Sequence, residues 1–342
     1  MPPQPLQDEL RWPRRWALLL SCATFPLIWV GGLVTTYDAG MAVPDWPNTF
    51  GYNLFLYPWQ SWVFGPWDLF IEHGHRQLGA IVGLLAIALL ISILRRERRA
   101  WVRMLAVVVL IAVVAQGVLG GMRVLYDNRQ LAMLHGCFGP AFFAMTAAMN
   151  VFLSPSWRSP IAAEMQSNTR LVRLSLALVV LTYLQLVLGA TMRHLPSFVT
   201  PPFFRAIVIF HLLTAAAVFG HIAALAWRME RQAHGPRALR WVTRCLSLLV
   251  IVQISFGAGT WVVKYGWPEW FANWGLAATY VVEAKSMLQS LTVTAHVAIG
   301  SLLLASSTAF AALATRRWLP VGQSMVSTDA VRHDRIDGNR AT

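Results

Sequence analysis

Four histidines of this chain lie near one end of alternate apolar segments, in positions that recur along the sequence. They are His75, His135, His211 and His296. Ionisable side chains are costly inside a lipid bilayer, so four in equivalent positions indicate a shared function. Neutral imidazoles that face one another inside a helix bundle are typical ligands of heme iron. The alternative is hydrogen bonding between helices, duplicated with the repeat. Ligation is preferred because duplication alone need not retain all four residues.

The histidines follow an internal repeat. Three segments place a glycine four positions after a glutamine, at Gln116–Gly120, Gln185–Gly189 and Gln253–Gly257. A loop and an apolar stretch with one of the histidines follow each segment, and the first stretch ends more loosely in the same way at Gly31 and Gly32. The repeating unit is therefore a helix pair, present four times. Its glycines permit close helix packing or leave room for a flat cofactor, and both interpretations stay open.

The composition is that of a polytopic membrane protein. Of the 342 residues, 56% are hydrophobic and only 13% are charged, about half the charge of an ordinary soluble protein. Apolar runs of about 20 residues, long enough to cross a bilayer, predict eight spans. They lie near residues 15–37, 74–95, 101–121, 131–153, 171–192, 206–228, 240–263 and 286–314.

The predicted fold class is all-α, with eight transmembrane helices arranged as two pseudo-symmetric four-helix bundles. Parallel repeats of this kind give a pseudo-twofold axis along the membrane normal. We expect an N-terminal tail, a first half, a cytoplasmic linker, a second half and a disordered C-terminal tail, at residues 1–14, 15–153, 154–170, 171–315 and 316–342. No small-residue cleavage site is evident near the first span, which we therefore interpret as a retained helix rather than a signal peptide.

The net charge of +13 is explained by topology. Basic clusters precede the first span, follow the last and occupy alternate loops, at residues 11–15, 95–103, 158–173, 228–244 and 316–317. Threading eight spans in order puts all of them on one side, so both termini are predicted to be cytoplasmic. Nucleic acid binding is not expected. The membrane is predicted to be a bacterial inner membrane, because the short N-terminal segment carries the acidic pair Asp8 and Glu9.

The three cysteines indicate no disulfide. Cys22, Cys137 and Cys245 all fall within predicted spans, and no CxxC or CxxCH motif occurs. An external disulfide, a redox dithiol and covalent heme attachment are therefore not predicted.

Glu72 is the candidate catalytic residue. It precedes His75 by three positions, so the two share a helix face. A carboxylate there could orient the imidazole, relay a proton or bind a reaction intermediate. The alternative is that Glu72 caps the N-terminus of the second span. His73 lies two positions before His75, so only one of these histidines can face the bundle interior.

The remaining histidines are assigned ordinary polar or hydrogen-bonding roles. They are His194, His221, His234 and His333.

Several arginines lie on the outer side, against the positive-inside rule: Arg76, Arg123, Arg129, Arg193 and Arg205. Guanidinium groups suit the two propionates of heme. Arg76, Arg123 and Arg193 are the candidates, with Arg76 favoured first because it adjoins His75. Snorkelling to the membrane interface is the competing explanation for each.

These residues resemble the heme A synthase family over about residues 15–315. The resemblance rests on Gly32-Leu33-Val34-Thr35, on the string from Ala39 to Pro47, on Glu72-x-x-His75-Arg76 and on the three later histidines. It implies oxidation of the C8 methyl of heme O to the formyl group of heme A by successive hydroxylations, for cytochrome oxidase assembly.

The resemblance also implies roles for the site residues. His75 and His135 would be the axial residues of the substrate heme in the first half, with Glu72 as the catalytic carboxylate. His211 and His296 would hold a heme b that serves electron transfer. The implied partners are heme O, heme O synthase, cytochrome oxidase assembly factors and membrane lipid. Whether the chain forms a homo-oligomer is left open.

One departure from the family pattern concerns cysteines. Many bacterial members carry a cysteine pair in the first outer loop and others one in the third, but neither loop has a cysteine here. The chain therefore resembles a cysteine-free branch, without support for a loop disulfide. Asp45 and Trp46 would instead shape an outer lid, although interfacial anchoring explains Trp46 equally well.

Two other functions stay open. A non-catalytic di-heme b electron carrier would share the four histidines but would not need Glu72. A heme transporter or assembly factor is expected to concentrate tryptophans in an outer segment, whereas the 16 tryptophans here are spread over loops and helix ends.

Overall fold

The computed structural model describes residues 10–158, 168–196, 198–231, 237–273 and 282–318. Eight helices in it are long and apolar enough to cross a membrane. They are α2 (Arg11–Thr36), α4 (Trp67–Arg96), α5 (Ala100–Leu125), α6 (Arg129–Leu153), α8 (Thr169–His194), α9 (Pro201–Arg231), α10 (Arg237–Tyr265) and α12 (Met287–Trp318). Three short helices, α3 (Trp59–Val63), α7 (Pro155–Arg158) and α11 (Glu269–Ala272), lie between them. The predicted all-α membrane protein is confirmed.

The helices extend beyond the predicted spans. The largest difference is at α4, which begins at Trp67 instead of near residue 74. Its first turns contain Glu72 and His73, which are polar yet buried. They break the apolar run but find hydrogen-bond partners in the preceding loop, so the helix continues past the end of the hydrophobic pattern.

The predicted tails are also shorter than expected. α2 already begins at Arg11, and α12 includes Arg316 and Arg317. Residues 1–9 and 319–342, and residues 159–167 of the predicted linker, lie outside the described residues.

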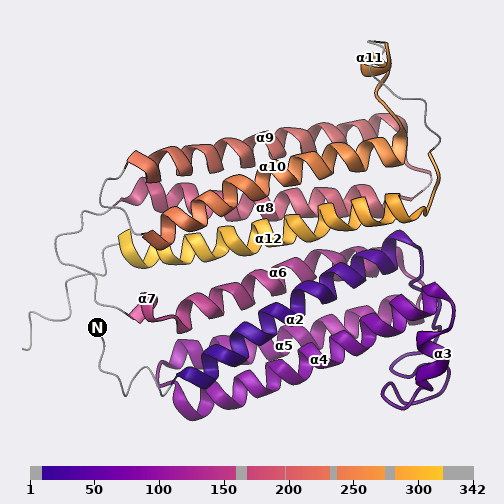
Figure 1. Cartoon of the computed structure of the whole chain (residues 1–342), viewed down its shortest axis with the longest axis horizontal. Helices are drawn as coiled ribbons and strands as arrows, with labels where there is room; N and C mark the ends of the chain where they lie inside the picture. The colour runs from indigo at the N-terminus through magenta and orange to yellow at the C-terminus, as the bar shows by residue number, and fades with distance from the viewer. Residues whose placement is uncertain (1–9, 159–167, 197, 232–236, 274–281, 319–342) are drawn as a thin grey trace, which may run out of the picture.

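The long helices form two bundles that lie side by side (Figure 1). In the first, α2 packs on α4, α4 on α5, α5 on α6 and α6 on α2. In the second, α8, α9, α10 and α12 repeat this cycle in the same order. The bundles meet where α6 packs on α12 and α8, and where α12 packs on α2. This arrangement is consistent with the predicted pseudo-symmetric pair.

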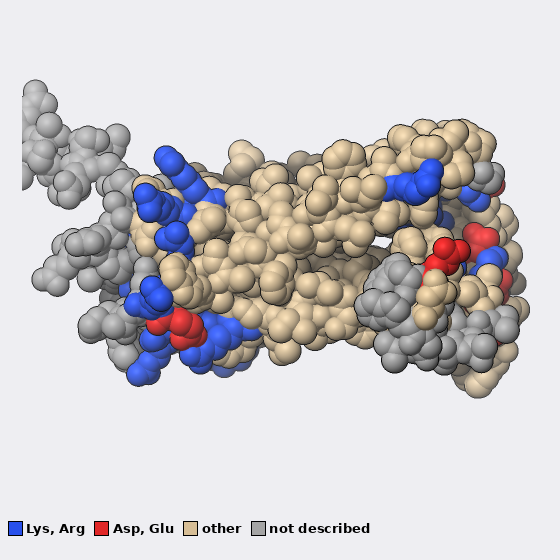
Figure 2. Space-filling model, turned by 90° about the horizontal axis from the view of Figure 1, so that it is seen from above, with Lys and Arg blue, Asp and Glu red and all other residues tan. Residues whose placement is uncertain are grey.

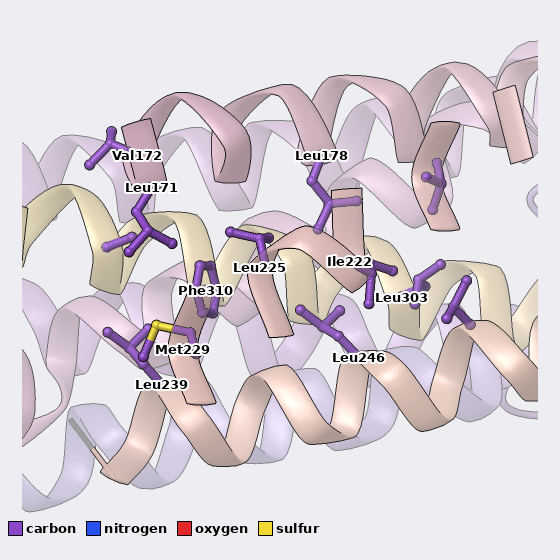
Figure 3. Packing of buried hydrophobic residues seen from close by; sticks show 13 residues of the cluster. Leu171, Val172, Leu178, Ile222, Leu225, Met229, Leu239, Leu246, Leu303 and Phe310 are labelled. Carbon is purple, nitrogen blue, oxygen red and sulfur yellow. The ribbon is translucent and has the colours of Figure 1, made fainter. Parts of the chain in front are cut away.

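Each bundle has its hydrophobic core near one end. In the second bundle the core includes Leu178, Leu225, Leu246 and Phe310, and residues from all four helices interdigitate there (Figure 3). The first bundle has a matching core, whose residues run from Ala17 to Leu153. These residues lie toward the basic ends of their helices, whereas the four histidines lie toward the opposite ends. The two main cores therefore do not extend to the ends of the bundles that bear the histidines.

Charged side chains gather at the ends of the long axis, and the face in Figure 2 shows a middle belt of uncharged residues. This distribution is expected of a protein whose belt faces lipid. At the basic end Glu97 is almost fully buried and accepts from Arg99 at 2.8 Å and Arg158 at 3.1 Å. Arg99 also donates to the carbonyl of Phe152. Glu97 thereby joins the α4–α5 turn to the end of α6.

Replacing this carboxylate should destabilise the first bundle. Burial raises the pKa of Glu97, but its bonds to Arg99 and the charge of Arg158 outweigh burial and lower the pKa below its ordinary value of 4.5. The carboxylate therefore stabilises the fold above pH 4.5, and this contribution is lost as the pH falls through the lowered pKa. We expect Glu97→Gln to cost about 1–3 kcal/mol, measured as a lower unfolding temperature at neutral pH. Glu230→Gln, which removes an exposed partner of Arg244, is the matched control. An equal fall in the unfolding temperature of both variants would contradict the stabilising role assigned to Glu97.

Candidate functional site

The structure brings the four histidines together in two pairs, one in each bundle. The ring centres of His75 and His135 are 6.2 Å apart, with an angle of 88° between the rings. The ring centres of His211 and His296 are 6.4 Å apart, at 62°. Each pair joins the second and fourth long helix of its bundle, as the repeat predicted.

Both separations suit two ligands of one metal ion. With a metal–nitrogen bond of about 2.0 Å and a ring centre about 1.1 Å behind the nitrogen, imidazoles on opposite sides of an ion have centres about 6.2 Å apart. Two side chains complete the coordination of an iron whose other ligands come from a macrocycle. The spacing of the residues is therefore compatible with heme, and their role as ligands stays a prediction.

A glycine of the preceding long helix faces each imidazole ring. In chain order, an added Cβ would lie 2.7 Å from the ring's Cε1 at Gly31, 3.2 Å at Gly120, 3.5 Å at Gly189 and 3.1 Å at Gly257. These are the glycines of the internal repeat. The contacts support the close-packing interpretation, because the group that packs on each glycine is an imidazole ring.

The residue four positions before each glycine completes the pattern. Its carbonyl oxygen accepts the helical hydrogen bond from the glycine N–H, and because glycine has no side chain, this oxygen is accessible to the ring. The carbonyl of Gln253 lies 3.2 Å from Nδ1 of His296, so an Nδ1–H can donate to it, and the side-chain Nε2 of Gln253 lies 3.5 Å from the Nε2 of the ring. The carbonyls of Leu27, Gln116 and Gln185 face the other three rings. Those three Nδ1 atoms are buried without a partner at hydrogen-bond distance among the described residues.

Glu72 lies on the same helix as His75 and is 1% exposed. Its Oε2 accepts from the backbone N–H of Val43 at 2.9 Å, and its Oε1 accepts from Arg76 at 3.0 Å. Arg123 of α5 is 3.9 Å from Oε1. Glu72 is in the second turn of α4 and binds the outer loop, so the alternative that it caps the helix N-terminus is wrong.

Arg76 holds the first outer loop. Its Nη1 donates to the carbonyls of Asp45 at 2.7 Å and Asn48 at 2.9 Å, and its Nη2 donates to Val43 at 2.7 Å and to Glu72. These bonds use the four terminal N–H groups of the guanidinium. The prediction that Arg76 binds a heme propionate is not tested. To bind one, Arg76 would have to give up one or more of these hydrogen bonds.

The other two candidate arginines have different surroundings. Arg123 packs its guanidinium against the backbone at Gly40, beside Glu72. Arg193 of α8 donates to the carbonyl of Gly32 at 2.8 Å and to the hydroxyl of Thr36, both on α2. Arg193 therefore joins the second bundle to the first at the outer end. Their propionate roles stay predictions.

The outer loop has a second set of contacts with α4 that sequence reasoning missed. His73 is buried, with Nδ1 3.0 Å from the hydroxyl of Thr49 and its ring against Tyr57 and Trp62. Gln77 donates to the carbonyl of Leu54. As predicted, His73 and His75 point apart, and His75 is the one that faces the bundle.

Two loop residues have the shaping roles proposed for them. Burial raises the pKa of Asp45, but the backbone N–H groups of Gly51 and Phe50, each 2.8 Å away, and the charge of Arg76 lower it overall. Its carboxylate thus fixes the turn at Phe50. Trp46 packs on Gly121 of α5 so closely that an added Cβ would clash with the indole. Packing against the bundle explains Trp46 better than interfacial anchoring.

Other histidines behave as expected for ordinary polar residues. His194 and His221 each place Nδ1 within 2.9 Å of the carbonyl four residues earlier in their own helix. His234 and His333 lie outside the described residues.

Comparisons with known proteins find some that are similar in sequence to this chain. Residues 65–204 match the COX15-CtaA family of cytochrome oxidase assembly proteins. The chain is 28% identical over 259 residues to a heme A synthase from Symbiobacterium thermophilum, covering 68% of this chain and 79% of the relative. It is 28% identical over 210 residues to a heme A synthase from Cereibacter sphaeroides, covering 52% of this chain and 53% of the relative.

The chain is therefore similar to heme A synthases, and the family model covers less than half of its length. The matched residues 65–204 contain Glu72, the first histidine pair and all three candidate arginines, whereas His211 and His296 lie beyond them. The likeness of the second pair to the first therefore rests on the repeat and on the shared glycine contacts. The eight apolar helices also fit the integral membrane protein that was predicted.

The glycine contacts can be tested by adding one methyl group. Gly31→Ala should displace His75, because the added Cβ would lie 2.7 Å from the ring. Overpacking of this kind costs about 1–3 kcal/mol, or roughly 5- to 150-fold in heme affinity. Bound heme per folded protein, from the pyridine hemochrome spectrum, is the measurement. Gly83→Ala on α4, which has nothing within 4 Å, is the control. Equal heme content in both variants would contradict the proposed packing.

Proposed function

We propose that this protein is a heme A synthase that oxidises the C8 methyl of heme O to a formyl group by successive hydroxylations, with loss of water from the final diol. One observation carries the proposal. Two histidine pairs have nearly equal spacing, but among the described residues only the first has a buried carboxylate, Glu72, one helical turn away. The relatives named heme A synthase support the same reaction.

In this proposal the first bundle binds heme O between His75 and His135. The bound iron supplies the oxidative chemistry, and the protein positions the methyl group. The glycine contacts would hold both imidazoles against the preceding helices. Arg76 and Arg123 place positive charge beside Glu72, whose oxygens would accept a proton or a hydrogen bond from the hydroxyl group of the reacting carbon. The loop held by Arg76 excludes water from that side.

The second bundle is proposed to hold a heme b between His211 and His296 for electron transfer. No described carboxylate accompanies this pair in the position that Glu72 has in the first bundle, where Val208 stands. A site with two histidine ligands and no acid–base group suits a redox carrier. Arg193, which bonds to α2 from α8, would keep the two sites at a fixed separation.

The basic end is proposed to face the cytoplasm of a bacterial inner membrane. Arginines are concentrated there on alternate loops, as the positive-inside rule requires. Both proposed heme sites then lie nearer the outer face, and both termini are cytoplasmic.

The nearly equal spacing of the pairs also supports a second candidate, a di-heme b electron carrier. Product analysis separates the two. Membranes that contain this chain together with a heme O synthase should accumulate heme A, detected by mass spectrometry of acid-acetone extracts. Only heme B and heme O in the extract, with the protein folded and heme-loaded, would exclude the synthase and leave the carrier.

Replacing the carboxylate tests its role. Glu72→Gln keeps the shape of the side chain but removes its charge and basicity, so heme A should fall by about 100-fold or more, while heme O or its hydroxylated form accumulates. Asp68→Asn, an exposed change in the first turn of the same helix, should leave heme A unchanged. Unaltered heme A formation by Glu72→Gln would remove Glu72 from the mechanism.

Replacing a ligand of the second pair tests the division of labour. His211→Ala should remove the heme b absorption while heme O remains bound to the first bundle, because the pairs lie in separate bundles. Redox difference spectra and extracted pigments report the two hemes independently. If His75→Ala and His211→Ala lost the same heme, the proposed separation into two sites would be wrong.

A further inference from the structure

An open pocket lies at the basic end of the second bundle, between α8 and α9. Its volume is about 340 Å³, and it is lined by Arg170, Arg173, Leu174, Ala177 and Arg228. Neither the histidine pairs nor the outer loop contribute to it. Three arginines from two helices thus converge on one hollow, next to the apolar side chains of Leu174 and Ala177.

The arginines of this pocket are not neutralised within the described part of the chain. At this end of the molecule the described carboxylates are those of Glu97, bound to Arg99 and Arg158, and of Glu230, bound to Arg244. The Nε of Arg228 is buried and has no hydrogen-bond partner among the described residues. A buried donor without a partner is costly, so the pocket favours a ligand that brings an anionic acceptor.

The depth of the pocket matches the headgroup region of a bilayer. Trp227, adjacent to Arg228, is 55% exposed, and the guanidinium of Arg231 lies 4.2 Å from the centre of its ring. Trp241 at the same end is 69% exposed. Exposed tryptophans at helix ends mark the membrane interface. Arg170 and Arg173 are themselves exposed on the first turns of α8, so an interfacial ligand can reach them.

We propose that this pocket binds the phosphate of an anionic phospholipid, with the start of an acyl chain along Leu174 and Ala177. The ligand chemistry is a phosphodiester that carries negative charge at one end and hydrocarbon at the other. Arginines at the rim satisfy the phosphate oxygens, and the apolar residues continue toward the membrane interior. Basic pockets between transmembrane helices on the cytoplasmic side suit such headgroups. The site does not depend on the proposed reaction.

Lipid retention by the full chain tests this proposal. The protein is released from mixed phosphatidylglycerol and phosphatidylcholine vesicles of equal acyl composition, and native mass spectrometry measures the phosphatidylglycerol that remains bound. Combining Arg170→Gln, Arg173→Gln and Arg228→Gln should reduce retention by about tenfold or more, since each arginine near the surface contributes about 1 kcal/mol to anionic lipid binding. The matched control combines Arg95→Gln, Arg96→Gln and Arg98→Gln, exposed residues at the same end of the first bundle, and should retain the lipid.

Three outcomes would overturn the proposal. The first is equal retention by the pocket variant and the unaltered protein. The second is an equal loss in the control variant, which would assign binding to net charge rather than to the pocket. The third is displacement of the lipid by millimolar inorganic phosphate in the unaltered protein, which would indicate a site for free phosphate. Heme absorption and elution volume verify that each variant is folded, since neither depends on the pocket.

Discussion

Both histidine pairs depend on one contact, in which each imidazole packs against a glycine of the preceding long helix, where no side chain covers the backbone. A glycine lets the histidine of the next helix approach the backbone closely, and at His296 the Nδ1 atom then lies 3.2 Å from a main-chain carbonyl. Helix packing therefore helps to set the ring orientation, and at His296 the side-chain amide of Gln253 also contacts the ring. Four copies of one contact produce two sites with nearly the same spacing.

Chemical difference between the two sites comes from outside the repeat. The loop before α4 supplies the N–H of Val43 to Glu72 and three carbonyls to Arg76. A carboxylate can be buried here because a guanidinium and a backbone donor satisfy its oxygens. The common scaffold positions the histidines, and the loop before α4 supplies the partners with which α4 buries Glu72. Duplication followed by local elaboration gives sites that share geometry but differ in charge.

The sequence predicted the helices and the pairing of the histidines, because both depend on periodic features. Apolar length determines which segments cross a membrane, and the repeat places His75, His135, His211 and His296 at equivalent depths. The start of α4 was misjudged because buried polar residues interrupt its apolar run. The partners of Arg76 and Arg193 were not predictable, since each contact joins residues distant in sequence and depends on how a loop or a bundle interface closes.

Under the proposed function, the position of the two hydrophobic cores bears on the route by which an electron donor could reach the hemes. Side chains from Ala17 to Leu153 in one bundle and from Leu171 to Ala314 in the other fill the basic ends. His75 and Arg96 are 21 residues apart on α4, which corresponds to about 30 Å of helix. A soluble reductant at the basic surface would face this packed hydrocarbon as an insulating layer. A donor that approaches from the outer face, or one dissolved in the membrane such as a quinol, has the shorter route.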